Sequence, residues 1–340
     1  MRISISLAKL VGFLLLASAS STFADVFKGA YVINAAEGAV LFAEKENYVG
    51  PPASVTKLMT FLVVQDAIKA KEISLLTPVT VTAEDAGMGG TQVWLKHNEV
   101  FTVEDLLYAL IIQSANDAAH ALSHTAAPTR EAFVAKMNAR AQQLGMTDTI
   151  WRSPHGLPPS SRRLDQTDMT SPRDLAKLAQ ALLRETDILD YSSIQMRPFG
   201  ESQREKPVIM RTHNHLVGKV AGVDGLKTGF TRAAGFCLAA TAERNGQRLI
   251  AVIMGCPTSQ ERDIRMAELL ENAFAKLPRT PSPISAAPER SVTTRPAPTE
   301  AAPAETPTLT IIKIDPEAAD DNPETANDEE PPTVVFELPY

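Results

Sequence analysis

The sequence predicts an α/β protein in which a sheet domain is interrupted by a helical subdomain. Short, alternating, turn-bounded strand patterns occur near the start of the body, over residues 26–43, and again from residue 208 onward. The segment between them, from about 80 to 190, consists mainly of helical patterns, and one last helical pattern follows the second group of strands. Strands and helices in this order indicate a sheet with helices packed against it and a helical insertion.

The first strand patterns form a hairpin over residues 26–43, with a turn at Glu37-Gly38. A helical run then begins after Pro51-Pro52 and continues to about Lys71, because a proline discourages helix in the residue before it. Apolar residues cover most of the circumference of this run, and such a helix is expected to be buried.

The middle of the chain contains a brief strand at residues 79–82 and then four helices. Thr102 and Asp105 resemble a capping box at the start of the first helix, and Pro172 occupies the first position of the last. The expected helices cover residues 103–112, 118–125, 130–144 and a segment that starts at 171–174. Strands follow at 223–229, 235–241 and 248–255, and a closing helix at 262–276.

The two cysteines, Cys237 and Cys256, lie in strand patterns that Asn245-Gly246 joins. A two-residue hairpin centred there places Cys237 opposite Met254 and Cys256 on the diagonal. Diagonal neighbours are roughly 7–8 Å apart, which is long for a disulfide. We therefore expect two buried free thiols, although export of the protein permits a disulfide.

Both ends of the chain differ from the body in composition. Residues 1–24 resemble a signal peptide, with basic Arg2 and Lys9, a short apolar core at 10–19, and the small residue Ala24 before the cleavage point. Residues 278–340 hold about half of the 24 prolines together with acidic runs, which predicts a disordered tail. The body is thus expected to be one catalytic domain over 25–277, exported to a bacterial periplasm. The net charge of −7 argues against a nucleic-acid binder.

A possible nucleophile and base stand at the start of the buried helix, in Ser54-Val55-Thr56-Lys57. Side chains three residues apart on a helix are neighbours. Burial and the positive helix end both lower the pKa of a lysine, so Lys57 can accept the hydroxyl proton of Ser54. The alternative is that Ser54 caps the helix while Lys57 extends to solvent.

Two further motifs follow in order: Ser114-Ala115-Asn116 on a turn between helices, and Lys227-Thr228-Gly229 at the end of a strand. Together with Ser54-x-x-Lys57 they resemble the serine penicillin-binding proteins and β-lactamases, whose middle motif is more often S-D-N. Residues 106–119, 153–157, 222–229 and 234–238 look like the low-molecular-mass D-alanyl-D-alanine carboxypeptidases. The similarity covers about residues 25–277.

This resemblance implies a DD-peptidase-like fold, with an antiparallel sheet and an inserted all-helical subdomain, and it implies acyl transfer without a metal or organic cofactor. The substrates would be peptidoglycan stem pentapeptides, and β-lactams would inhibit. By resemblance, the nucleophile is Ser54, the base Lys57, and the proton relay Ser114 beside Asn116. Substrate would be held by Lys227, Thr228, Gly229 and Arg262, and the oxyanion by the backbone N–H groups of Ser54 and Phe230.

Two features depart from that family. The chain has a Pro-rich acidic tail in place of a second domain and a basic amphipathic helix, which leaves attachment to the inner membrane open. Residues 157–168 also look atypical, so substrate preference there cannot be inferred.

Other functions make different demands on the sequence. A class A β-lactamase needs a loop glutamate for deacylation, but no Glu occurs between Glu131 and Glu185. A related endopeptidase, which cuts D-alanyl cross-links, stays open. A zinc peptidase would use the H-E-x-x-H motif. His120 and His124 have its i, i+4 spacing, but the glutamate is missing, so we expect these histidines on a helix surface. A nucleotide-binding loop over 222–228 would need Gly in place of Leu226. A non-catalytic wall-binding protein would not be labelled by penicillin.

Overall fold

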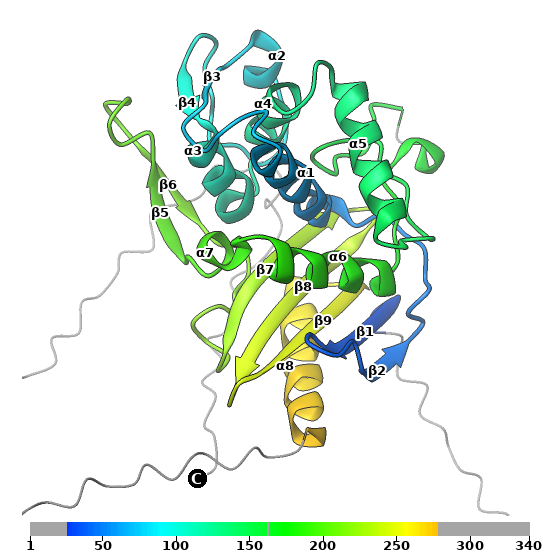
Figure 1. Cartoon of the computed structure of the whole chain (residues 1–340). Coiled ribbons are helices and arrows are strands. Elements are labelled where there is room, and N and C mark those ends of the chain that lie inside the picture. The colour runs from blue at the N-terminus through cyan, green and yellow to red at the C-terminus, as the bar shows by residue number, and fades with distance from the viewer. Residues whose placement is uncertain (1–25, 162, 278–340) are drawn as a thin grey trace, which may run out of the picture. The chain divides into compact units, whose positions relative to one another are not determined.

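The computed structural model describes residues 26–277 apart from residue 162. The expected signal peptide (1–24) and tail (278–340) lie outside the described residues. Figure 1 shows the described body as a central sheet with a helical part beside one end of it. The statements below concern this body.

The central sheet has five strands in the order β2-β1-β9-β8-β7, and every neighbouring pair is antiparallel. β1 (Gly29–Asn34) and β2 (Val40–Glu44) form the first hairpin, and β1 also pairs with β9, the last strand among the described residues. The remaining strands are β7 (Val223–Thr231), β8 (Gly235–Arg244) and β9 (Gln247–Cys256). β7 stands at one edge of the sheet.

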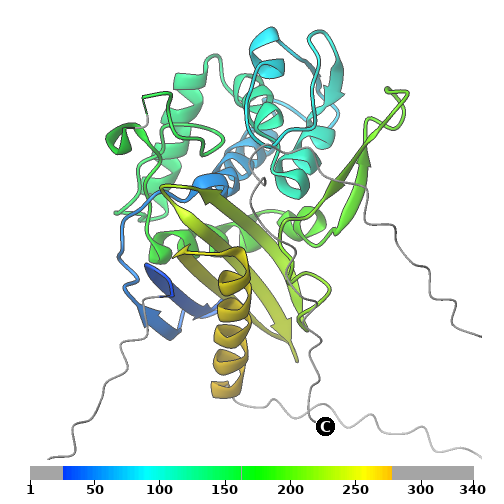
Figure 2. The same cartoon turned by 180° about the vertical axis from the view of Figure 1, so that it is seen from behind.

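Helices cover both faces of this sheet. Helix α6 (Pro172–Glu185) packs on β1 and β9, and α8 (Ser259–Lys276) packs on β8 and β9. Figure 1 shows α6 in front of the sheet, and Figure 2, which views it from the opposite side, shows α8 in front. Successive strand residues point to opposite faces, so Ile250 and Val252 join the core on the α6 side while Leu249 and Ile253 join the core under α8.

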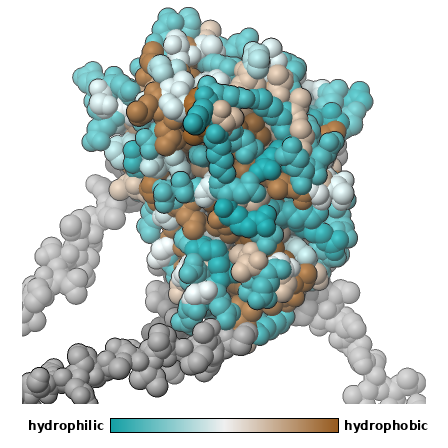
Figure 3. All heavy atoms as spheres, viewed as in Figure 1, coloured by the Kyte–Doolittle hydropathy of each residue, from teal (hydrophilic) through white to brown (hydrophobic). Residues whose placement is uncertain are grey.

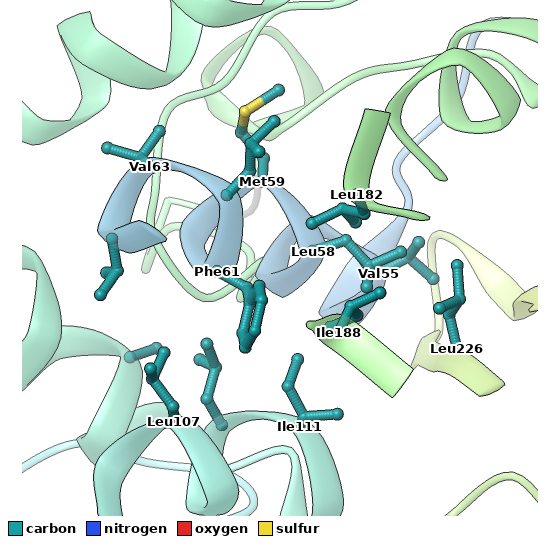
Figure 4. Packing of buried hydrophobic residues seen from close by; sticks show 14 of the residues in the cluster. Val55, Leu58, Met59, Phe61, Val63, Leu107, Ile111, Leu182, Ile188 and Leu226 are labelled. Carbon is teal, nitrogen blue, oxygen red and sulfur yellow. The ribbon is translucent and has the colours of Figure 1, made fainter. Parts of the chain in front are cut away.

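Helix α1 (Lys57–Lys69) runs through the larger of these two cores. Figure 4 shows Phe61 pointing toward Leu107 and Ile111, with Val55 on the side of Ile188. Nine of the thirteen residues in α1 are buried, on all sides of the helix. The helix is therefore the shared centre of the sheet and the helical part, as its all-round apolar pattern predicts.

The helical part lies between β2 and β7 in the sequence. It comprises α2 (Ala83–Ala86), α3 (Val103–Tyr108), the π-helical turn η2 (Ala109–Gln113), α4 (Asn116–Thr125) and α5 (Arg130–Gln143). It also contains a two-stranded ladder of β3 (Pro78–Thr80) and β4 (Val100–Thr102). After α6 come the short turn of helix α7 (Ile188–Ser192) and the hairpin β5 (Met196–Phe199) and β6 (Val208–Arg211).

The predicted fold class is confirmed, namely an antiparallel sheet flanked by helices with a helical insertion. The capping box is present, since Thr102 and Asp105 each bind the other's backbone N–H. Both cysteines are free and buried, as predicted. The expected hairpin register holds from the pair Leu238–Ile253 to the turn. A shift between Phe236 and Leu238 breaks it at the cysteines and places Phe236 opposite Cys256. The two thiols consequently belong to different cores on opposite faces of the sheet.

The surface in Figure 3 is mostly hydrophilic, with hydrophobic residues in small groups. Exposed large apolar side chains are spread over several elements of the described body, among them Leu76, Trp94, Met196 and Ile209. Scattered residues of this kind are normal for a protein surface. Within residues 26–161 and 163–277, no helix combines the length and the apolar character that a membrane span requires.

We expect Ile253→Ala to lower the free energy of unfolding by about 2–5 kcal/mol, because it leaves a cavity between the sheet and α8. The matched control is Ile264→Ala, which removes the same atoms from an exposed position of α8 and should change stability by no more than about 0.5 kcal/mol. Urea denaturation followed by circular dichroism measures both variants. Equal losses in the two would contradict this account of the second core.

Candidate active site

Ser54 and Lys57 meet where a turn passes into the central helix. The 3₁₀ turn η1 (Ala53–Thr56) leads directly into α1, so the two side chains project from consecutive parts of one helical run. Lys57 is fully buried, and its Nζ lies 3.0 Å from the Oγ of Ser54. The sequence alternative, in which Lys57 extends to solvent, does not hold in the structure.

The Lys57 amine has two other partners. Its Nζ lies 2.7 Å from Oδ1 of Asn116 and 2.8 Å from the carbonyl oxygen of His155. Burial, followed by the positive charge of Lys227, holds the pKa of Lys57 well below that of an ordinary lysine. In the neutral form the amine keeps two donors for the two oxygens of Asn116 and His155, and its lone pair can accept from the Ser54 hydroxyl.

The segment that carries Ser114 and Asn116 contains a change of helix type, and Asn116 contacts Lys57 from it. The π-helical turn η2 ends at Ser114, whose φ of 64° is left-handed, and α4 begins two residues later. Asn116 is fixed by the preceding loop, since its Nδ2 donates to the Gly89 carbonyl at 2.8 Å and its backbone N–H to that of Thr91 at 2.8 Å. Both Ser114 and Asn116 are buried. Non-glycine residues with positive φ concentrate at functional sites.

The third motif lies on the edge strand β7, which packs against the η1 turn. Lys227 and Thr228 are buried, and burial together with Arg262 lowers the pKa of Lys227 to about 7. A Cβ on Gly229 would collide with the Pro52 carbonyl oxygen and lie 3.0 Å from the backbone nitrogen of Ser54. A glycine is therefore required for the strand to approach the nucleophile turn this closely.

Two more predicted residues flank this strand. Phe230 is 42% exposed, and its ring stacks on that of Phe236 at 4.1 Å. Arg262, near the start of α8, is buried, and its Nε donates to Oδ1 of Asp263 at 2.9 Å. Its Nη2 lies 2.7 Å from the same oxygen, although without hydrogen-bond alignment. Arg262 is close enough to Lys227 to be the main charge that lowers the pKa of that amine.

Sequence analysis missed the residues that hold the loop carrying His155. Asp168 is fully buried and accepts from the backbone N–H and the hydroxyl of Ser153, at 3.0 and 2.7 Å. It also accepts from the hydroxyl of Thr56, in the nucleophile turn, at 3.3 Å. Gly156 has a φ of 86°, and a Cβ there would collide with the Ala53 carbonyl. The only sequence signal was Ser153-Pro154-His155-Gly156, which the resemblance contains but whose contacts depend on the fold.

The expected surface position of His120 is wrong. This residue is buried, and its Nδ1 lies 2.6 Å from Oδ1 of Asp85, which α2 brings against α4. His124 is partly exposed, and its Nε2 lies 3.0 Å from Oδ2 of the same carboxylate. The contact joins two helices that are distant in the sequence, so the pattern within α4 does not indicate it.

Taken together, the site offers a hydroxyl beside a buried amine with a lowered pKa, and a strand with two buried cationic side chains nearby. A hydroxyl with an adjacent base is the arrangement required for nucleophilic catalysis. Buried cations beside it suit a substrate that ends in a carboxylate. Among the described residues these groups come from η1, α1, α4, β7 and α8, which are separated in sequence but brought together by the sheet and the central helix.

Comparison with known proteins gives a consistent result. The family model described as D-alanyl-D-alanine carboxypeptidase matches residues 18–258. The carboxypeptidase DacF of Bacillus subtilis is 33% identical over 278 residues, which cover 78% of this chain and 70% of that protein. DacC of Escherichia coli is 34% identical over 70% of this chain, which spans only 59% of that relative's length. A D-alanyl-D-alanine endopeptidase of Haemophilus influenzae is 32% identical, over 58% of this chain and 64% of its own length.

Solved structures agree with the fold. Penicillin-binding protein 5 of Haemophilus influenzae aligns with a TM-score of 0.68 and 30% identity, over 74% of this chain and 71% of its own. Penicillin-binding protein D2 of Listeria monocytogenes, in its ampicillin-bound form, aligns with a TM-score of 0.65 and 29% identity, over 73% and 97%. The family model spans well over half of the sequence and includes all but one of the predicted site residues. The chain therefore belongs to the D-alanyl-D-alanine carboxypeptidase family.

Proposed function

We propose that the protein is a serine D-Ala-D-Ala carboxypeptidase that removes the terminal D-alanine from peptidoglycan stem pentapeptides. The observation that carries the proposal is the 3.0 Å contact between the Ser54 hydroxyl and the buried Lys57 amine. A lysine with a lowered pKa can take a serine proton, whereas an ordinary charged lysine cannot. Membership of the D-alanyl-D-alanine carboxypeptidase family indicates that the bond cleaved is the one between the two terminal D-alanines.

The reaction has two stages, and Ser54 is the nucleophile in the first. Its Oγ bonds to the carbonyl carbon between the two D-alanines while its proton passes to Nζ of Lys57. The C–N bond then breaks, and the departing amine receives a proton through Ser114. In the second stage water attacks the resulting ester, gives up a proton to the same base, and regenerates the Ser54 hydroxyl. Asn116 holds the base through its 2.7 Å contact with Lys57.

The β7 side of the site would bind the substrate. Lys227, Thr228 and Arg262 present two cations and a hydroxyl for its terminal carboxylate. The backbone N–H groups of Ser54 and Phe230 would form the oxyanion hole, and one such donor is worth about 3–4 kcal/mol of barrier. Gly229 supports this assignment, because it lets the strand lie close to the Ser54 amide. No step in this scheme uses a metal or an organic cofactor.

The same chemistry makes β-lactams inhibitors. A β-lactam carries a strained amide next to a carboxylate, so it can acylate Ser54 in place of the stem peptide. The Listeria monocytogenes relative is known in an ampicillin-bound form. The sequence has no glutamate between Glu131 and Glu185 to activate a deacylating water in the manner of a class A β-lactamase. Slow release of the drug, and hence inhibition rather than resistance, is the expected result.

An endopeptidase that cuts D-alanyl cross-links is the second candidate. A relative from Haemophilus influenzae has that name. The nucleophile and base would be the same, and the difference would lie in what the β7 side accepts beyond the scissile bond.

We also propose the domain organisation and location inferred from the sequence. Residues 1–24 would be a cleaved signal peptide, residues 25–277 the periplasmic catalytic domain, and residues 278–340 a disordered tail. The chemistry supports this location, because peptidoglycan lies outside the cytoplasm. A peripheral position at the inner membrane, which the sequence leaves open, is compatible with the scheme.

Ser54→Ala should lower kcat for D-alanine release by about ten-thousandfold or more, because it removes the nucleophile. It should also abolish the adduct that a fluorescent penicillin forms with the protein. Ser193→Ala, at the exposed residue that follows α7, is the matched control and should leave both unchanged. If Ser54→Ala retains labelling or activity, the assignment of the nucleophile is wrong. A chelator-sensitive reaction that survives this substitution would instead indicate a zinc peptidase.

The pH dependence of kcat/KM should be bell-shaped with its two limbs set by two lysines. Activity rises with pH as Lys57 loses its proton, and this limb lies well below the pKa of a free lysine. Activity falls as pH passes about 7, because Lys227 then loses the charge that binds the carboxylate. Lys227→Arg keeps the charge and should move the falling limb to higher pH, whereas Lys219→Arg at an exposed site should not. An unmoved limb in Lys227→Arg would show that another group controls it.

Purified protein should release D-alanine from pentapeptide monomers faster than it cleaves cross-linked dimers. The two substrates are compared at equal concentration by chromatography of the products, with Ser54→Ala as the blank. Faster cleavage of the dimers would favour the endopeptidase. Turnover of penicillin at a comparable rate would favour a β-lactamase. A protein that neither cleaves these substrates nor is labelled by penicillin would be a non-catalytic wall-binding protein.

A further inference from the structure

Three metal-ligating side chains come together on the helical part, outside the Ser54 site. Asp85 lies at the third position of α2, and His120 and His124 lie one turn apart on α4. One carboxylate oxygen is 2.6 Å from Nδ1 of His120, and the other is 3.0 Å from Nε2 of His124. The three candidate ligand atoms all lie within 4.8 Å of one another.

The chain builds this cluster from two local patterns. On a helix, residues i and i+4 project from one face, so His120 and His124 point the same way. Asp85 is fixed by the capping box of α2, in which its Oδ2 accepts from the Thr82 backbone N–H at 2.7 Å. Packing of α2 against α4 then brings the carboxylate to the two rings. The side chains of Asp85 and His120 are almost wholly buried, and that of His124 is 30% exposed.

The spacing of the three side chains suits a small transition-metal ion. Bonds of about 2.0–2.1 Å in a tetrahedron place neighbouring ligand atoms roughly 3.3 Å apart. The nitrogens of His120 and His124 lie 2.6 and 3.0 Å from the two different oxygens of Asp85, and the three candidate ligand atoms lie within 4.8 Å of one another. Side-chain shifts would therefore bring all three to bonding distance of one ion. Each ring nitrogen that now faces Asp85 would turn its lone pair to the ion, with the ring proton on the other nitrogen.

A hollow of about 850 Å³ opens next to the cluster. It is lined by His120 and His124 and also by Glu84, Ser123 and Glu131. The hollow gives an ion a path from solvent and room for water at the coordination positions that the protein does not fill. Glu84 and Glu131 add negative charge beside that path, and Arg130 on the same wall partly offsets it.

We propose that Asp85, His120 and His124 bind a Zn²⁺ ion, with water from the hollow completing its coordination. Two imidazoles and one carboxylate form a ligand set that zinc prefers, whereas Mg²⁺ and Ca²⁺ take oxygen ligands almost alone. This site lies outside the Ser54–Lys57 centre and takes no part in the acyl transfer. The proposal therefore stands independently of the proposed function.

The ion would join two segments that hold Asn116. Helix α4 begins at Asn116 and carries both histidines, and α2 leads into the loop whose Gly89 and Thr91 carbonyls accept hydrogen bonds from Asn116. Zinc bound at one end of α4 would thus tie α2 and its loop to the helix. Such a site is a structural link, comparable to a disulfide in an exported protein.

Zinc binding to the untagged, chelator-treated full chain tests the proposal by isothermal titration calorimetry. We expect one Zn²⁺ per chain, a higher melting temperature in its presence, and visible absorption bands on replacement by Co²⁺. His124→Ala should weaken zinc binding by about 100-fold or more and remove the rise in melting temperature. The matched control His97→Ala, which removes an exposed histidine, should bind zinc like the unaltered protein.

A second variant, Asp85→Asn, covers the case in which His124→Ala disturbs the fold, because Asn keeps the size of the side chain. It should also weaken zinc binding, while circular dichroism remains unchanged. Ser54→Ala should bind zinc normally, so failure of this proposal is distinguishable from failure of the peptidase assignment. Zinc binding that is absent in the unaltered protein, or equal in His124→Ala and His97→Ala, would show that the three side chains form only a hydrogen-bonded cluster.

Discussion

The burial of one amine, that of Lys57, is the constraint on which the site depends. An isolated ammonium group inside a protein is costly, so the group shifts its pKa and loses its proton more easily. Here burial is the largest cause of the lowered pKa, and the second amine of Lys227 adds repulsion. The amine acts as a base because burial and the charge of Lys227 outweigh the carboxylates of Asp117 and Asp168, which act in the opposite direction on its pKa.

The surrounding structure serves to keep that amine in place. Asn116 and the carbonyl of His155 each accept from it, and each is fixed in turn by a neighbouring loop. Asp168 connects the His155 loop to the nucleophile turn through Ser153 and Thr56. The buried polar groups therefore form two hydrogen-bonded clusters, one around Lys57 and one around Asp168, that meet on the nucleophile turn and on the loop carrying His155. Loss of one member of a cluster leaves its partners unsatisfied. The apolar packing around α1 supplies the rigidity that such a network needs.

Much of the fold could be predicted because its signals are local. The hairpin between β8 and β9 follows from Asn245-Gly246, whose φ angles of 52° and 74° are those that the pair favours. The contact of Ser54 with Lys57 follows from helical spacing. The left-handed conformation of Ser114 could not be predicted, because nothing in the sequence around it marks the end of a π-helical turn.

The contacts that sequence analysis missed are those between distant segments. The burial of His120 depends on Asp85, 35 residues earlier, and the role of Asp168 depends on Thr56, 112 residues earlier. The break in register beside the cysteines was missed because the irregularity between Phe236 and Leu238 lies inside a strand with no proline to reveal it. The periodicity of apolar residues describes one helix or strand at a time and does not indicate which elements pack against each other.

The position of β7 at the end of the sheet has a consequence for how molecules enter. An edge strand has backbone groups along one side that no neighbouring strand pairs, and these groups run in a fixed direction. At the start of β7, side chains of Ser192 and Asn214 already bind the carbonyls of Asp224 and Gly225. An extended peptide that lies along this side extends the sheet by one strand, so its polarity is set before any side chain is recognised. Main-chain geometry alone can thus distinguish the two ends of the bound peptide.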